Sequence, residues 1–75
     1  MFDLIVLTPK QTLFDDAVES VWIDGDQTEY ELLSFHAHLL GILRGRIIID
    51  KKKVIPIKRG IVSFYENKCT VLAEQ

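Results

Sequence analysis

Short apolar segments rich in β-branched residues run the whole length of this chain, and residues that favour turns separate them about every eight to twelve residues. This spacing is typical of β-sandwiches and barrels, whose many short strands are joined by tight turns. Helical periodicity is hard to place anywhere in the sequence. We therefore predict an all-β fold, a two-sheet antiparallel β-sandwich of about nine or ten short strands, filling a single domain over residues 1–75.

The strands are placed by the apolar runs between turn signals. They are expected to include residues 2–8, 11–15, 17–24, 27–33, 46–50, 53–58, 60–65 and 68–73. A tight turn is expected at Asp24-Gly25-Asp26, because glycine tolerates positive φ. The last four strands form two hairpins, with tips at Lys51-Lys52 and Glu66-Asn67, and residues 34–45 are interpreted as irregular.

Alternation of side chains along each strand predicts the core. The residues expected to face inward are Ile47, Ile49, Ile55, Ile57, Val62, Phe64, Cys69 and Val71. Pro56 has the opposite parity from Ile55 and Ile57. Since proline has no N–H to donate to a β-ladder, we expect its strand to lie at an edge or to carry a bulge. Ile48 is an apolar exception on the outward parity. Trp22 shares the polar parity of its strand, so we predict a partly exposed surface anchor, or a ring that covers the rim of the core.

Charge and composition narrow the classes of partner. The chain has 9 Lys and Arg residues and 11 Asp and Glu residues, a formal net charge of -2, so it has no general attraction to nucleic-acid phosphates or anionic lipid. Hydrophobic residues make up 48% of it, enough for a core and a surplus that can face a partner. No apolar stretch approaches the about 18 residues of a membrane-spanning helix. Cys69 is the single cysteine and no signal-like N-terminus is present, which favours a cytosolic chain.

A metal site or an active site finds little support. His36 and His38 could share one face of a strand and hold zinc with Glu31 or Asp26, but there is no second ligand cluster, and loop histidines bonded to backbone carbonyls or water are the preferred interpretation. Ser34 lies near His36 without the glycines of a nucleophile elbow. The segment 41–45 lacks the Lys-Ser/Thr of a phosphate loop, and so small a domain has little volume for a substrate. We expect no catalysis, no small-molecule substrate, no metal and no cofactor.

Basic residues are concentrated in the second half of the chain, where small barrels can bind single-stranded nucleic acid. They are Arg44, Arg46, Lys51, Lys52, Lys53, Lys58 and Arg59. Only Phe64 and Tyr65 follow them, and Phe64 is expected inside, so no stacking platform is evident. Lysines at a hairpin tip also prevent edge-to-edge pairing. We expect no nucleic-acid partner, and a single-strand binder stays as the weaker alternative.

The order of segments resembles the N-terminal β-sandwich domain of the epsilon subunit of F-type ATP synthase, called delta in mitochondria. The opening IVLTPKQTLFDDAVESV resembles the family's first strands with their Thr-Pro turn, and the closing NKCTVLAE resembles its NKVTVLAD. The middle, YELLSFHAHLLGILRGRIII, is similar to the family pattern FGILPGHAPLLTALKPGVLRI. The matched residues are His36, Ala37, Leu39, Leu40, Gly45 and Gly60. Where the family has PGHAP this chain has SFHAH, and Thr28 replaces a glycine.

This resemblance implies a non-catalytic central-stalk rotor subunit that binds the gamma subunit and the c-ring and couples ion-driven rotation to ATP synthesis. Such a subunit lies on the cytoplasmic, inner face of the cell membrane and touches the membrane only through the c-ring. The resemblance implies c-ring contacts at Glu29, Tyr30, Glu31 and His36. It implies gamma-subunit contacts at Thr8, Ala37, Leu39 and Leu40.

Family members commonly continue into a helical hairpin that inhibits ATP hydrolysis. This sequence stops before it, so the resemblance implies a short form without the C-terminal hairpin. A stand-alone β-sandwich that binds some other protein is the main alternative to a rotor subunit.

Overall fold

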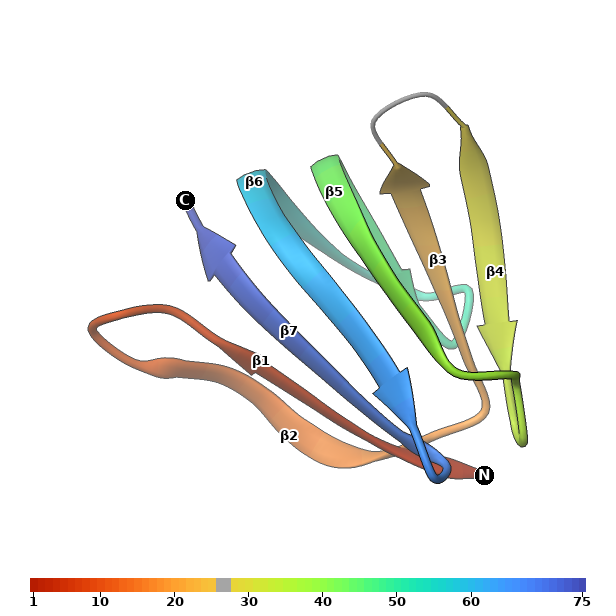
Figure 1. Cartoon of the computed structure of the whole chain (residues 1–75). Helices are drawn as coiled ribbons and strands as arrows, with labels where there is room; N and C mark the ends of the chain where they lie inside the picture. Colours follow the sequence, from red (N-terminus) through yellow and green to blue (C-terminus); the bar gives the residue numbers. More distant parts are fainter. Residues whose placement is uncertain (26–27) are drawn as a thin grey trace.

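The strands of the computed structural model, which describes residues 1–25 and 28–75, form one sheet that closes over its own inner face. In chain order they are β1 (Phe2–Leu7), β2 (Thr12–Val18), β3 (Ser20–Gly25), β4 (Glu29–Leu33), β5 (Leu39–Ile49), β6 (Lys53–Tyr65) and β7 (Lys68–Glu74). In the sheet their order is β2-β1-β7-β6-β5-β3-β4 (Figure 1). The predicted all-β fold is confirmed, and the described residues contain no helix.

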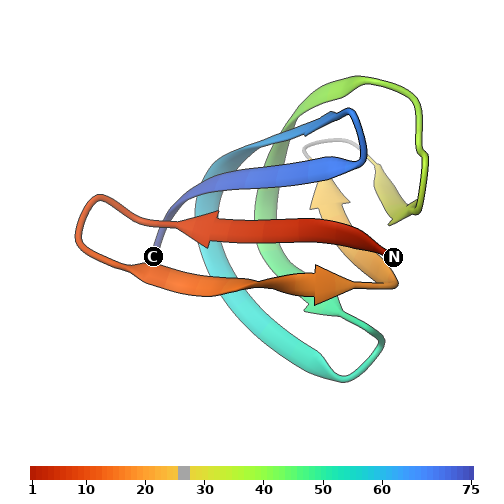
Figure 2. The ribbon, with the colours of Figure 1, turned by 90° about the horizontal axis from the view of Figure 1, so that it is seen from below.

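The two longest strands make the sandwich by belonging to both layers. β5 and β6 contain 11 and 13 residues, and Figures 1 and 2 show both curving from one layer into the other. One layer holds β2, β1 and β7 with the first part of β5 and the last part of β6. The other layer holds β3 and β4 with the remaining parts of β5 and β6. The seven strands would number nine if each bent strand were counted in both layers.

Four expectations about the strands and their pairing need correction. Residues 53–58 and 60–65 form one continuous strand, and residues 39–45, expected to be irregular, are the first part of β5. Ala17 and Val18 belong to β2 rather than to the third strand. The sheet is also not wholly antiparallel, because β1 and β7 pair in parallel. These two strands come from opposite ends of the chain, so no hairpin turn dictates their relative direction.

The inward-facing residues predicted from alternation are all buried, and Phe2 and Phe64 meet edge to face with ring centroids 5.2 Å apart. The edge predicted from Pro56 is confirmed, since β7 pairs with β6 only from Arg59 onward. Trp22 and Ile48 are half-buried on the outer face.

The turns follow the sequence closely. Glu66 and Asn67 form the expected hairpin tip, with φ angles of 49° and 60°. In the other hairpin the left-handed residues are Asp50 and Lys51, one position before the expected tip. Asp50 Oδ1 also accepts a hydrogen bond of 2.7 Å from the amide of Glu19, where the chain passes between layers. Of the residues expected at the turn after β3 and in the fourth strand, 26 and 27 lie outside the described ranges.

Glycines lie where the long strands bend. The register of β5 against β6 shifts between Leu43 and Gly45. Gly45 has a φ of 104°, which residues other than glycine rarely adopt. Gly60 pairs with Leu43 across the same bend. A Cβ atom on Gly60 would lie 2.7 Å from the backbone oxygen of Leu72, so the bend depends on close approach of two strands.

Replacing Gly60 with alanine should therefore destabilise the domain by about 2 kcal/mol, because the new methyl group meets backbone rather than a movable side chain. Urea denaturation followed by circular dichroism measures the change. A variant as stable as the wild-type chain would show that β6 and β7 can separate without loss, and that this glycine does not shape the bend.

Candidate functional site

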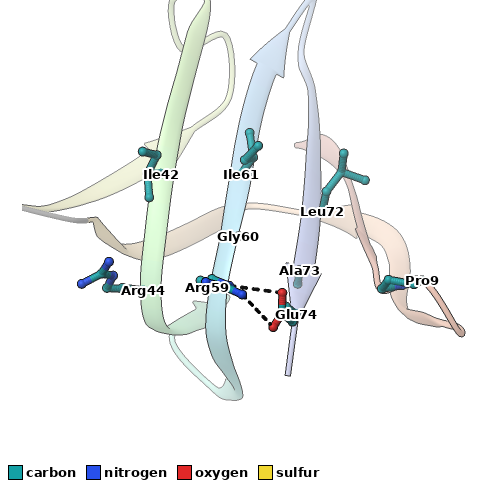
Figure 3. Close-up of a pocket in the computed structure, with 9 residues that line it drawn as sticks. All are labelled: Pro9, Ile42, Arg44, Arg59, Gly60, Ile61, Leu72, Ala73 and Glu74. Carbon is teal, nitrogen blue, oxygen red and sulfur yellow. Dashed lines mark hydrogen bonds and ion pairs between the residues drawn. The ribbon is translucent and has the colours of Figure 1, made fainter.

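Three apolar side chains line up on the outer face of the layer that contains β7. Ile42 of β5 pairs with Ile61 of β6, which pairs with Leu72 of β7. Their side chains stand on the same surface in Figure 3, and each residue is at least half exposed, at 57%, 50% and 53%. We call these three residues the outer apolar row. Leu7 of β1 continues the register from Leu72.

A shallow hollow of about 430 Å³ adjoins the outer apolar row (Figure 3). Pro9 and Arg44 line it, together with an ion pair in which Arg59 Nε lies 3.2 Å from Glu74 Oε2. The hydrogen bonds and positive charge of Arg59 lower the pKa of the exposed Glu74 carboxyl. The surface is therefore apolar at its centre and charged at its border, the pattern of a protein-binding patch.

The residues expected to contact gamma differ in how far their side chains are exposed beside this face. Leu40 is 72% exposed and points outward, two residues from Ile42 on β5. Leu39 has the opposite parity and packs against the core. Ala37 is exposed in the loop before β5. Alternation along a strand thus separates two adjacent leucines, and of the two only Leu40 points its side chain into solvent.

Thr8 occupies the turn between β1 and β2. Its hydroxyl donates to the Gln11 carbonyl at 3.1 Å and accepts from the Gln11 and Lys10 amides, at 3.1 and 3.3 Å. The turn and Glu74 line a second hollow that shares Pro9 with the first. Thr8 therefore shapes the border of the apolar face, while its hydroxyl is engaged within its own turn.

The expected c-ring contacts follow the edge strand β4 without meeting at one point. Glu29 is exposed at the start of the strand, Glu31 is half-buried on the same side, and His36 is exposed beyond the other end. Tyr30 points the other way and packs against the core. Its hydroxyl is buried and has no hydrogen-bond partner among the described residues, and burial, followed by the charge of Cys69, raises its pKa. Tyr30 thus supports β4 from inside with its hydroxyl buried, and its expected contact with the c-ring stays a prediction.

The two histidines lie in the loop between β4 and β5, not on a strand. His36 Nδ1 lies 2.8 Å from the Ala37 carbonyl oxygen, as the preferred interpretation predicted, and the His36 and Phe64 rings meet edge to face with centroids 5.7 Å apart. The His38 and Tyr65 rings also meet edge to face, with centroids 5.0 Å apart. Within residues 1–25 and 28–75, no group of three or more His, Cys, Asp or Glu side chains is placed to hold a metal ion.

Trp22 lies on the outer face of the other layer. Its strand neighbours are Glu31 on β4 and Ile48 on β5, and Ile48 in turn pairs with Val54 of β6. Trp22, Glu31 and Ile48 line a groove of about 390 Å³. The half-buried ring covers part of the sheet, as one of the two interpretations predicted, and its use as a binding anchor stays a prediction.

Several basic side chains are engaged within the chain. Arg46 Nε lies 3.4 Å from Asp24 Oδ2, Arg59 pairs with Glu74, and Lys53 Nζ lies 5.4 Å from the centre of the Phe14 ring. These contacts reduce the charge available to a nucleic-acid strand. In the part of the chain that the structure describes, no helix is long and apolar enough to cross a membrane.

Sequence reasoning missed the outer apolar row and Phe35. The parity that placed Val62 and Val71 inside also placed Ile61 and Leu72 outside, so part of the signal was present. Phe35 is 84% exposed with a φ of 61°, and the signal was a phenylalanine where the family pattern has glycine.

Comparisons with known proteins agree over the whole chain. A family model for the ATP synthase delta/epsilon chain β-sandwich domain matches residues 1–75. The ATP synthase epsilon chains of a Nitratiruptor species and of Campylobacter concisus are 38% and 36% identical to this chain over 76 residues. Each alignment covers 95% of this chain, which spans only 59% of the length of either relative.

A solved structure has the same fold. A chain from the cryo-EM structure of the Tetrahymena thermophila mitochondrial ATP synthase central stalk and c-ring superposes with a TM-score of 0.83 at 13% identity. The match covers 97% of this chain and 63% of that one. By its match to the family model along its full length, this chain belongs to the ATP synthase delta/epsilon chain β-sandwich domain family.

Proposed function

We propose that this domain is a non-catalytic rotor component of an F-type ATP synthase. It binds the gamma subunit through the outer apolar row and rests on the c-ring through the β4 edge. Rotation of the ring is thereby passed to the stalk and coupled to ATP synthesis. The domain lies on the cytoplasmic face of the membrane and reaches the membrane only through the c-ring.

The outer apolar row is the observation that supports this proposal best. The inner faces of both layers are already filled by a continuous core, so Ile42, Ile61 and Leu72 contribute nothing to that core. An exposed apolar centre with a charged border favours a protein partner over a small molecule. The family resemblance implies the gamma subunit as the partner, and the central-stalk origin of the structural neighbour and the epsilon-chain relatives support a place in the rotor.

The β4 edge has the chemistry for the second contact. Glu29 and Glu31 project from the same side of an edge strand, and His36 follows in the next loop. Carboxylates and imidazole form hydrogen bonds and ion pairs with polar or basic loops, and such contacts set register and orientation more than affinity. A packed sandwich suits this work because interdigitated side chains pass load between layers with little deformation.

Removing both polar groups, by Glu29→Ala together with His36→Ala, should weaken binding to a detergent-solubilised c-ring by about tenfold. The thermal midpoint should stay within about 2 °C, since both side chains are exposed. Pull-down with the purified c-ring gives the affinity and circular dichroism gives the midpoint.

Asp15→Ala on β2, the opposite edge of the sheet, is the matched control and should bind normally. Loss of the fold in the double variant would mean that Glu29 and His36 are structural. Equal c-ring binding by the wild type and the double variant would show that the β4 edge does not contact the c-ring.

A further inference from the structure

The side chain of Asn67, in the β6–β7 turn, bonds the backbone of the loop between β4 and β5. Asn67 Oδ1 accepts a 2.7 Å hydrogen bond from the amide of Phe35, and Asn67 Nδ2 donates a 2.9 Å bond to the carbonyl of Met1. The backbone oxygen of Asn67 also accepts from the amide of Asp3 at 3.3 Å. One residue thus joins the loop, the turn and the start of the chain.

Phe35 has a backbone conformation that its residue type rarely adopts. Its φ of 61° is left-handed, and a bulky side chain there is strained. Such conformations persist where surrounding contacts over-determine them. The contacts are the bond to Asn67 and, on the next residue, a 3.2 Å bond from the His36 amide to the Leu33 carbonyl.

The strained residue adds little to the core. Phe35 is 84% exposed, while the neighbouring His36 and His38 rings pack against Phe64 and Tyr65. A fixed loop therefore carries a large apolar side chain into solvent. Rigid exposed aromatics are favourable binding anchors, because little conformational freedom is lost when a partner covers them.

We propose that Asn67 is a positioning residue, which holds this loop so that Phe35 is presented as a preformed anchor to the gamma subunit. The inference rests on the proposed function. The gamma subunit is chosen because the loop leads directly into Leu40 and the outer apolar row along β5, and because its Phe35 and Ala37 are themselves exposed apolar residues. Of the groups proposed for the c-ring, Glu29 and Glu31 lie on β4, and His36 lies in this loop with its ring against Phe64.

Two substitutions distinguish the role of the Asn67 side chain from the role of its backbone conformation. Asn67→Gly keeps a residue suited to the φ of 60° and removes both side-chain bonds. Asn67→Asp keeps an acceptor for the Phe35 amide but cannot donate to Met1. Hydrogen exchange of the Phe35 amide, measured by NMR, reports the loop without any partner, and calorimetry with the purified gamma subunit reports binding.

In Asn67→Gly, exchange of the Phe35 amide should accelerate by about threefold to tenfold, the worth of one hydrogen bond. Affinity for gamma should fall by about tenfold, since the loop must then be ordered on binding. Asn67→Asp should retain slow exchange and most of the affinity. Phe35→Gly should lower the affinity by at least about tenfold while leaving the sheet amides protected.

Unchanged exchange in Asn67→Gly overturns the positioning role, and so does faster exchange with unchanged gamma affinity. Normal gamma binding by Phe35→Gly overturns the anchor. If the wild-type chain fails to bind gamma, the proposed function fails and the presentation of Phe35 to gamma fails with it. The exchange measurements still decide whether Asn67 holds the loop.

Discussion

Replacing Ile61 with glutamate is expected to weaken binding to the gamma subunit by at least about 100-fold while the domain stays folded. Ile61 is the middle member of the outer apolar row and is 50% exposed, so its substitution leaves the core intact. In the complex, however, the carboxylate would be buried without a partner, and desolvating an unpaired charge is costly. Calorimetric titration against purified gamma measures the loss.

Val54→Glu is the matched control for this prediction. Val54 lies on the same strand, is also β-branched and is 54% exposed, but it belongs to the outer face of the other layer. It should bind gamma with wild-type affinity. Equal weakening by both substitutions would point to a general effect of the added charge. Normal binding by Ile61→Glu would show that the outer apolar row is not part of the interface with gamma.

Alkaline solution should unfold this domain through Cys69. Burial raises the pKa of the Cys69 thiol from 9.0 to about 12, so the folded chain keeps a proton that the unfolded chain loses. Ionisation of the thiol in the unfolded chain alone favours unfolding, so the free energy of unfolding is highest below pH 9.0 and falls as the pH rises toward 12. Three units of pKa correspond to on the order of 4 kcal/mol, a large part of the stability of a small domain. Urea denaturation at a series of pH values measures the decline.

Cys69→Val supplies the control, because valine removes the titrating group and stands at this position in the family pattern. Tyr30 remains, and its raised pKa destabilises the fold in the same direction, but only above the ordinary tyrosine value of 10.0. The variant should therefore begin to lose stability about one pH unit later than the wild type. Identical pH profiles for the two chains would show that the thiol ionises equally in the folded and unfolded states.

Much of the fold follows from local pattern. Alternation located the core because the side-chain period of a strand is two and each inward residue is set by its own strand. Polar residues between apolar runs, Lys51-Lys52 and Glu66-Asn67, located both hairpins. Glycine signals were misleading at the bends, where Gly45 and Gly60 were taken as strand ends although the ladder continues past them.

Relations between distant strands were harder to predict. The parallel pairing of β1 with β7 involves the two ends of the chain, and no local signal specifies it. The outer apolar row exists only because three strands pair in one register. The resemblance supplied Leu40 and the histidine loop, whereas the left-handed backbone of Phe35 and its bond to Asn67 became visible only in three dimensions.

Site-directed cross-linking would test the central claim most directly. A benzophenone maleimide is attached at Ile61→Cys in the Cys69→Val background, where it has no other thiol to modify. After assembly with gamma and the c-ring, illumination should join position 61 to the gamma subunit, while the same probe at Val54→Cys should not react with gamma. Cross-linking to gamma from position 54 but not from 61, or from neither, would contradict the account.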